Sequence, residues 1–256
     1  GPVGLSIIQL LKLKGARRVY CVDILDYAFE AAREVGADGV FNSAEVDVVP
    51  EILSDEEAVM IEPTTIAVQC CSRAELESED TVMIIGSGAL GSSILRIVKL
   101  YNPIIVTDID DAKLEEAKKN GATYTINSLK EDVPAKAHEL TEGYGPTVTI
   151  DAACVKGSLL TALQATGNAG RVITMGFSVA PTEVNQFVIT SKELDVRGSR
   201  LQNRKFQDVI DLVNEGKVDL RGSISHTWNF EDAQAAFDFV DSRDPSYRKG
   251  VLTFKK

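Results

Sequence analysis

The chain has 256 residues, 44% of them hydrophobic, which is enough for one large domain or two modest domains with buried cores. Its 38 acidic residues outnumber its 27 basic residues, and the net charge of −11 argues against a basic nucleic-acid-binding face. No apolar run approaches a membrane span in length and the four cysteines lack CxxC spacing, so we expect a cytoplasmic protein with free thiols and without nucleic-acid or membrane partners.

The first segment of the chain recurs further along. Residues 1–43, GPVGLSIIQLLKLKGARRVYCVDILDYAFEAAREVGADGVFNS, resemble residues 88–128, GALGSSILRIVKLYNPIIVTDIDDAKLEEAKKNGATYTINS. Allowing one short gap, the matched pairs are Gly1 with Gly88, Gly4 with Gly91, Lys12 with Lys99, Asp23 with Asp108, Ala32 with Ala117, Gly36 with Gly121, and Asn42 with Asn127. Two copies do not make a solenoid. We interpret the pair as a duplication of one half of a mononucleotide-binding unit.

The two copies differ in what precedes them. The second follows EDTVMIIGSG, whose Val- and Ile-rich run predicts a buried parallel strand that ends in a tight turn. The first lacks such a strand, so we expect only the second copy to hold a nucleotide well. We divide the chain into a partial duplicated segment (1–54), a linker helix region (55–79) and a nucleotide-binding domain with a C-terminal return segment (80–256). The join falls near AEVDVVPEILSDEEA.

From residue 81 onward, apolar strand-like runs alternate with amphipathic helical stretches. The expected strands are 81–86, 104–108, 123–126, 147–151, 171–176 and 195–198. The expected helices are 88–100, 111–120, 129–141, 156–166 and 204–214. This alternation predicts an α/β fold with a doubly wound parallel sheet of the Rossmann type, in strand order 3-2-1-4-5-6. Near the C-terminus, KGVLTF predicts one more strand.

A glycine motif lies between the strand at 81–86 and the helix at 88–100. Its residues Gly86-Ser-Gly88-Ala89-Leu90-Gly91 form a G-x-G-x-x-G pattern. Gly86 allows the sharp turn, Gly88 lets the backbone approach a pyrophosphate, and Gly91 lets the helix lie close to the sheet. Phosphates would bind at the helix N-terminus, where unpaired N–H groups and the helix dipole favour anions.

Asp108 follows at the end of the second strand of this unit. Its carboxylate can accept hydrogen bonds from ribose hydroxyls and would repel a 2′-phosphate, which favours NAD over NADP. Lys113 either packs near the adenine or is a solvated helix residue. A methyltransferase also places an acid after a glycine-rich turn, and it is the alternative to a dinucleotide site.

Residues after Asp55 resemble the cofactor domain of zinc-dependent medium-chain dehydrogenases, in the polyol, sugar-acid and threonine dehydrogenase branch. The resemblance lies in SDEEAVMIEPTTIAVQCCSRA, DTVMIIGSGALG, VTDID, KNGATYTINS, TIDAACVKGSLLTAL, GRVITMGF, KELDVRGSR and NEGKVDLRGSISHTWNFEDAQAAFD. It implies hydride transfer between a secondary alcohol and NAD, with a zinc ion polarising the oxygen. Glu62 matches the family's acidic zinc ligand, or is a carboxylate stabilised by a helix N-terminus. The family's Gly-His-Glu stretch and its first zinc cysteine do not occur in the sequence.

The resemblance also implies further cofactor contacts at the carboxyl ends of later strands. The residues concerned are Ala153, Cys154, Met175, Gly176, Ser199 and Arg200. Cys154 is equally well explained as a small buried thiol. Cofactor domains of this family often pair through edge strands, so we expect a homo-oligomer in which the last strand extends another subunit's sheet.

The hypothesis that these patterns favour is an NAD(H)-binding oxidoreductase domain whose substrate is a small alcohol or sugar. Its first alternative is a catalytically incompetent NAD-binding or assembly module left by a gene deletion or fusion. A second alternative is a fragment that binds no nucleotide because residues 1–54 cover the cleft. The sequence does not identify the alcohol.

Overall fold

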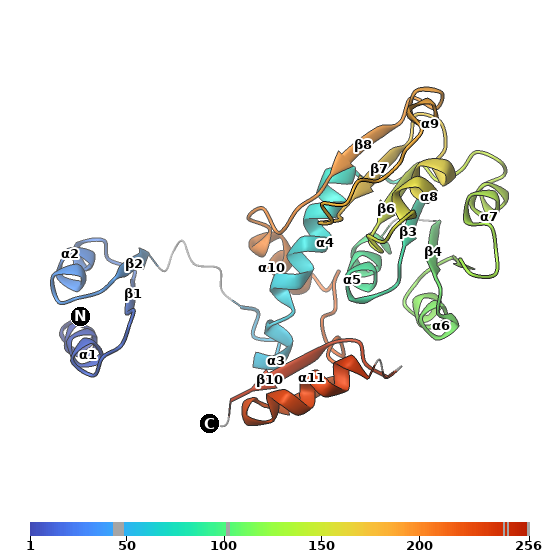
Figure 1. Ribbon diagram of the computed structural model, residues 1–256. Helices are drawn as coiled ribbons and strands as arrows, with labels where there is room; N and C mark the ends of the chain where they lie inside the picture. The colour runs from blue at the N-terminus through green and yellow to red at the C-terminus, as the bar shows by residue number, and fades with distance from the viewer. Residues whose placement is uncertain (43–48, 101–102, 243, 245, 255–256) are drawn as a thin grey trace. The chain divides into compact units, whose positions relative to one another are not determined.

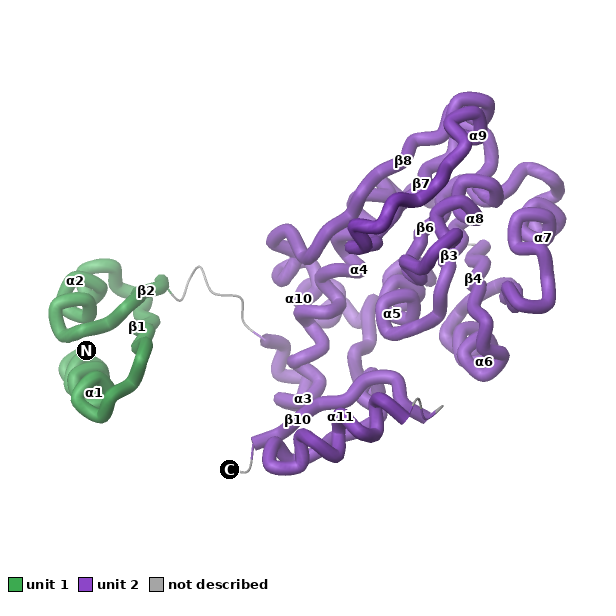
Figure 2. Tube along the Cα trace, in the orientation of Figure 1, with its two compact units in different colours: residues 1–48 green, residues 49–256 purple. Residues whose placement is uncertain are grey.

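The protein divides into two compact units, Gly1–Val48 and Val49–Lys256, which Figure 2 colours separately. A computed structural model describes residues 1–42, 49–100, 103–242, 244 and 246–254, and its elements are labelled in Figure 1. Residues 43–48, which belong to the expected join between the duplicated segments, lie outside the described residues. Each unit is built from parallel strands joined by helices.

Unit 1 is a small helix–strand–helix–strand segment. Its elements are α1 (Pro2–Leu13), β1 (Tyr20–Asp23), α2 (Tyr27–Glu34) and β2 (Gly39–Asn42). β1 and β2 pair in parallel, with Tyr20 opposite Gly39 and Asp23 opposite Asn42. A small core of Ile8, Val19 and Ala32 joins the helices to the strands. The unit therefore has the element order of half a nucleotide-binding fold.

Unit 2 contains a six-stranded parallel sheet. Its strands are β3 (Val82–Ile85), β4 (Ile104–Asp108), β5 (Tyr124–Asn127), β6 (Val148–Asp151), β7 (Arg171–Thr174) and β8 (Asp195–Gly198). They lie in the order β5-β4-β3-β6-β7-β8. Numbered from β3, this is the doubly wound order 3-2-1-4-5-6 expected from the sequence. The sheet reverses its winding between β3 and β6, so a crevice opens there at the carboxyl ends of the strands.

Helices cover both faces of this sheet. They are α4 (Ile61–Ala74), α5 (Ala89–Val98), α6 (Asp111–Lys119), α7 (Val133–Leu140), α8 (Ser158–Ala165), α9 (Gln186–Thr190) and α10 (Phe206–Asn214). A further short helix, α3 (Asp55–Ala58), precedes α4 and buries no residue. Alternate residues of β3 enter two cores: Ile84 packs with α4, α5, α6 and α10, and Met83 packs with α7 and α8. A strand buried on both faces must be apolar at every position, which explains the uninterrupted run Val82–Ile85.

The C-terminal residues form a separate strand pair. β9 (His226–Asn229) and β10 (Gly250–Thr253) pair in parallel, and a short 3-10 turn (Phe230–Asp232) and α11 (Ala233–Asp241) lie between them in sequence. The ring of His226 stacks on that of Trp228. The last strand therefore has one partner, β9, within its own chain, and its pairing with another subunit stays a prediction.

The two copies of the repeated segment make equivalent local contacts. Asn42 Nδ2 donates to Asp26 Oδ1 at 2.9 Å, and Asn127 Nδ2 donates to Asp111 Oδ1 at 2.6 Å. In unit 1, Asp23 accepts a hydrogen bond from the amide two residues on, at 3.2 Å. Asp108 does the same in unit 2, at 3.1 Å. The two segments are therefore alike in these side-chain hydrogen bonds as well as in sequence.

The largest boundary difference from the sequence prediction is at α7, which begins at Val133 rather than near residue 129. Asp132 caps this helix by accepting a hydrogen bond from the Ala135 amide. The Asn127 side chain accepts from the Leu129 amide, which holds the preceding residues in a turn. Within the described residues, none of the helices has both the length and the apolar character needed to cross a membrane.

Candidate functional site

The glycine turn between β3 and α5 is tightly packed. Gly86 has φ +93°, and a Cβ placed there would meet Ala153 backbone atoms at 3.0 Å. A Cβ at Gly91 would lie 1.8 Å from the carbonyl oxygen of Gly86, which is a steric overlap. Around Gly88, by contrast, no described atom comes within 4 Å of such a Cβ. Two of the glycines are thus required by the protein's own packing, and the third leaves space in front of the helix N-terminus.

Asp108 lies at the carboxyl end of β4 and faces this turn. Its Oδ2 accepts a hydrogen bond from the Ser87 amide at 2.7 Å, and its Oδ1 accepts one from the Asp110 amide at 3.1 Å. These bonds hold the carboxylate beside the glycine turn in a fixed orientation. Each carboxylate oxygen has two acceptor positions, so capacity remains for hydroxyl donors of a ligand.

A groove of about 690 Å³ runs along the carboxyl ends of β3, β4 and β6. We call it the wide groove, and its lining includes Gly86, Gly88, Asp108, Ile109, Lys113, Val133 and Ala153. Ile109 and Val133 give it apolar surface, and Asp108 gives it a charged acceptor. Its volume lies within the range of roughly 300–1,000 Å³ that is typical of small-molecule sites.

The wide groove adjoins a second hollow at the N-terminus of α5, the basic pocket, with which it shares the lining residues Gly88 and Lys113. Four cations and one carboxylate are among the described residues that line this pocket: Arg96, Lys113, Arg248, Lys249 and Glu116. Positive side chains beside a helix N-terminus favour an anion. The pocket therefore carries positive charge in a protein whose net charge is −11.

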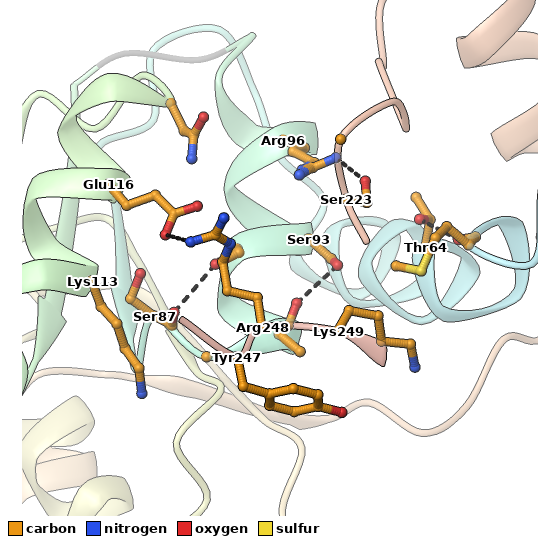
Figure 3. Close-up of a pocket in the computed structure, with 16 residues that line it drawn as sticks. Thr64, Ser87, Ser93, Arg96, Lys113, Glu116, Ser223, Tyr247, Arg248 and Lys249 are labelled. Carbon is orange, nitrogen blue, oxygen red and sulfur yellow. Dashed lines mark hydrogen bonds and ion pairs between the residues drawn. The ribbon is translucent and has the colours of Figure 1, made fainter. Parts of the chain in front are cut away.

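The C-terminal segment closes one side of the basic pocket. Figure 3 shows Arg248 extending toward Glu116 on α6, and their Nη1 and Oε2 atoms are 3.2 Å apart. Ser225 Oγ fixes this segment by accepting hydrogen bonds from the amides of Arg248 and Lys249, at 2.9 and 3.1 Å. On the opposite side, Arg96 donates to the carbonyl oxygen of Asp219 at 2.9 Å.

A third hollow, the apolar pocket, shares Ala89, Ser93 and Lys249 with the basic pocket. It is lined by Met60, Pro63, Ile66, Ala89, Leu90, Ser93, Met175, Phe177, Ser199, Leu201 and Lys249. Met175 and Ser199 follow β7 and β8, and both are more than nine-tenths buried. Among the described side chains, the Ser199 hydroxyl is the buried polar group without a hydrogen-bond partner.

Besides Gly91, which packs against Gly86, three sequence-predicted cofactor residues do not line these hollows: Cys154, Gly176 and Arg200. Cys154 adopts φ +54°, and its amide donates to Asp151 Oδ1 at 3.0 Å. Burial, and then the charge of Asp151, raise the pKa of the Cys154 thiol. Gly176 lies beside Cys154, and the guanidinium of Arg200 is 5.5 Å from the centre of the Phe177 ring. A cation over an aromatic face is a stabilising contact.

Glu62 lies in the first turn of α4, where it is exposed. Its neighbours Met60 and Pro63 line the apolar pocket. In the part of the chain that the structure describes, no three His, Cys, Asp or Glu side chains gather as metal ligands. Zinc sites use four such donors, or three with an open position. The described residues do not fit a zinc ion, and Glu62 as a ligand remains a prediction.

The described glycine turn and hollows do fit a dinucleotide. The space in front of Gly88 and the oriented carboxylate of Asp108 are features that a bound ligand would use. Sequence reasoning missed the Arg248–Lys249 pair and Arg96, because their approach to α5 depends on long-range folding. The two adjacent cations before GVLTF, Arg248 and Lys249, were the signal that could have identified that segment.

Comparisons with known proteins agree with this architecture. A sequence profile of the zinc-binding dehydrogenase family matches residues 2–71 and 88–215. The chain is 37% identical to the starvation-sensing protein RspB of Escherichia coli K12, over 81% of this chain and 62% of that protein. It is 28% identical to a sorbitol dehydrogenase of Bacillus subtilis, over 84% of this chain and 60% of that protein. The chain therefore spans about 60% of the length of these curated relatives.

Solved structures show the same fold. A short chain alcohol dehydrogenase, RspB from E. coli CFT073, complexed with NADH, is 35% identical, with a TM-score of 0.75 over 85% of this chain and 67% of that chain. An alcohol dehydrogenase from Thermus sp. ATN1 has a TM-score of 0.75 at 23% identity, over 81% of this chain and 60% of that chain, which shows the fold alone. Because the family profile covers most of the chain, including the helix of the glycine turn, the chain belongs to the zinc-binding dehydrogenase family and carries the fold of its cofactor domain.

Proposed function

We propose that unit 2 binds NAD(H) across the three adjoining hollows, as the cofactor domain of a dehydrogenase that oxidises a secondary alcohol. The observation that carries the proposal is that the three hollows adjoin one another around the glycine turn. Asp108 lines the wide groove, Gly88 and Ala89 at the start of α5 line the basic pocket, and Met175 and Ser199 line the apolar pocket. Sugar, phosphates and an aromatic ring follow one another in the same order along a dinucleotide.

Each hollow suits one part of NAD(H). In the wide groove, Ile109 and Val133 offer apolar contact to adenine, and Asp108 accepts hydrogen bonds from the ribose. In the basic pocket, the α5 amides after Gly88 and the side chains of Lys113 and Lys249 attract the pyrophosphate. The negative charge of Asp108 disfavours a 2′-phosphate, so the proposed cofactor is NAD rather than NADP.

The apolar pocket would receive the nicotinamide ring. Leu90, Met175 and Phe177 exclude water from this end of the site. The proposed cofactor contacts are Gly86, Gly88, Ala89, Leu90, Gly91, Asp108, Lys113, Ala153, Cys154, Met175, Gly176, Ser199 and Arg200. When bound, the nicotinamide supplies a hydride acceptor, and the protein supplies its position and surroundings.

The substrate and assembly of the full protein are also proposals. The relatives named sorbitol dehydrogenase and alcohol dehydrogenase suggest an alcohol or sugar as the hydride donor. β8 is the last strand in the sheet order, so we further propose that copies of this domain associate through it. We also propose that the duplicated segment and the NAD-binding domain are separate functional parts, because residues 1–48 and 49–256 form two compact units.

Calorimetric titration of the purified full chain tests the proposal. We expect saturable binding of NADH and ADP-ribose, weaker binding of NADPH, and no binding of S-adenosylmethionine. NADH at a hundred times its Kd should stabilise unit 2 by about 2.7 kcal/mol. Preferential binding of S-adenosylmethionine would instead favour the methyltransferase alternative, and no binding of any of the four would contradict a nucleotide site.

A second assay separates the enzyme from the NAD-binding module. Sorbitol and other secondary alcohols are mixed with NAD and the protein, and NADH formation is followed by absorbance. NADH binding without alcohol oxidation supports the module, and sustained oxidation supports the complete activity.

A further inference from the structure

Ser225 joins two segments of the C-terminal region, directly before the point where β9 and β10 begin to pair at His226 and Gly250. Its Oγ accepts hydrogen bonds from the amides of Arg248 and Lys249, at 2.9 and 3.1 Å. Its single proton goes to the carbonyl oxygen of Lys249 or to Nδ1 of His226, each 3.0 Å away. A serine hydroxyl has two acceptor positions, and the two amides occupy both. The side chain of Ser225 therefore fixes the backbone of two consecutive residues.

The two residues that Ser225 holds direct their side chains to different parts of the site. Arg248 extends toward Glu116 on α6, with which it forms an ion pair, whereas Lys249 points away from Glu116 (Figure 3). Lys249 lines both the basic pocket and the apolar pocket, beside Ala89, the first residue of α5. A lysine amine sits on a flexible four-carbon stem. The place where its backbone is held therefore decides which part of the site the amine can reach.

Ser225 lies outside the parts of unit 2 that hold the sheet together. It is only partly buried, and it belongs to neither of the two cores that flank the six-stranded sheet. Without the hydroxyl, water can bond to the two amides in its place. We therefore expect the C-terminal segment to become more mobile while the sheet stays intact, since local stability differs across a fold.

We propose that Ser225 is a positioning residue of the cofactor site, whose hydroxyl holds Lys249 where its ammonium meets the pyrophosphate. This inference rests on the proposed NAD(H) function and adds to it a residue that does not touch the ligand. Ser225 is not among the described residues that line the three hollows. Its contribution is electrostatic and specific to the phosphates, because the adenosine part of the cofactor carries no negative charge of its own. Binding of a ligand without phosphates should therefore not depend on Ser225.

The test compares ADP-ribose, which contains the pyrophosphate, with adenosine, which lacks it. For Ser225→Ala we expect the Kd of ADP-ribose to rise about 3- to 10-fold, because the ammonium is held less firmly near the phosphates. The Kd of adenosine, measured by competition, should change by less than about twofold, which also shows that the site is still folded. Ser242→Ala, at an exposed serine of the same C-terminal segment, is the matched control.

A double-mutant cycle with Lys249 separates positioning from a general structural role. Lys249→Met removes the charge and should raise the Kd of ADP-ribose about 10-fold, the effect of one charge-assisted contact. Because Ser225 acts through Lys249, adding Ser225→Ala to this variant should raise the Kd by less than about twofold further. A serine with a purely structural role would instead weaken binding by the same factor with and without Lys249.

Each outcome decides the proposal. An unchanged Kd for ADP-ribose in Ser225→Ala, an equal rise for adenosine, or additive effects of the two substitutions would overturn the positioning role while leaving NAD binding intact. Failure of the unmodified protein to bind ADP-ribose or NADH would overturn the proposed function as well. A loss that is confined to ADP-ribose, and that disappears once Lys249 is replaced, supports both.

Discussion

The two copies of the repeated segment have similar sequences but different surroundings. In unit 2, β4 pairs with both β3 and β5, and Ile105 is fully buried. In unit 1, the described strands give β1 a partner only in β2, and the equivalent residue Tyr20 is 53% exposed. The local hydrogen bonds of Asn42 and Asn127 are nonetheless alike. Local contacts thus follow the local sequence, whereas burial depends on neighbouring strands and helices.

The glycines show the same difference. Gly4 and Gly91 are matched in sequence, and both are helical. A side chain at Gly4 would meet no described atom within 4 Å, while one at Gly91 would overlap the carbonyl oxygen of Gly86. Packing therefore requires glycine at position 91, whereas position 4 has room for a side chain. The following predictions test how far this contrast extends.

The largest expected effect is at the paired glycines. Gly91→Ala should destabilise unit 2 by more than about 3 kcal/mol, because the turn must move to admit the methyl group, and NADH binding should be lost with it. Gly4→Ala should be neutral or stabilise α1 by up to about 1 kcal/mol, since alanine favours helices. Fluorescence of the single tryptophan, Trp228, reports denaturation of unit 2, and hydrogen exchange reports α1. Equal responses of the two variants would contradict the contrast.

The next effect concerns the matched residues Ile105 on β4 and Tyr20 on β1. Ile105→Ala should lower the free energy of unfolding of unit 2 by about 2–5 kcal/mol, because it leaves a cavity in a fully buried core. Tyr20→Ala should cost less than about 1 kcal/mol, since half of that side chain is already in water. Urea denaturation followed by circular dichroism measures both. A loss at Tyr20 as large as that at Ile105 would mean that β1 has a covering partner in solution.

A smaller effect is expected at the paired aspartates. Asp108→Ala should raise the Kd of NADH about 10- to 100-fold, because a charged acceptor facing the ribose is lost. It should also reduce the preference of the protein for NADH over NADPH. Asp23→Ala is the matched control in unit 1 and should leave both Kd values unchanged. Calorimetric titration measures all four values. Weaker NADH binding in the Asp23 variant would show that unit 1 also takes part.

The smallest effect is expected at one exposed aspartate in each unit, and it should be similar for the two. Hydrogen bonds from Lys12 and then from the Val19 amide lower the pKa of Asp38 in unit 1. Those from Lys130 and then Asn127 lower the pKa of Asp111 in unit 2. A carboxyl whose pKa is lower in the folded state stabilises the fold above its ordinary pKa of about 4. That stability is lost as the pH falls through the folded pKa, and it is small because both groups are exposed.

Carbon-detected NMR titration of the carboxyl groups checks this. Replacing Lys12 or Lys130 with methionine should return the pKa of its partner toward the ordinary value, and added salt should act in the same direction. A normal pKa for either aspartate in the unmodified protein would contradict the hydrogen bonds described for it.

Much of the fold could be predicted from the sequence. The run Val82–Ile85 is apolar at every position because both of its faces are buried, and the glycines that follow it permit only a tight turn. Strand–helix alternation then leads to the parallel sheet and to its order. Asp108 could be placed at the carboxyl edge of the sheet because it ends an apolar strand. All of these follow from local patterns of a few residues.

The rest of the site was decided by tertiary structure. Arg248 and Glu116 are 132 positions apart, and only the path of the C-terminal segment brings them together at the basic pocket. The apolar pocket likewise combines residues of α4, α5 and the loops after β7 and β8. Whether the Ser199 hydroxyl finds a partner depends on all of those neighbours at once. The sequence by itself determined the elements and the turn between them, because hydrogen bonding and side-chain periodicity are local. The packing of distant segments determined which side chains face the ligand.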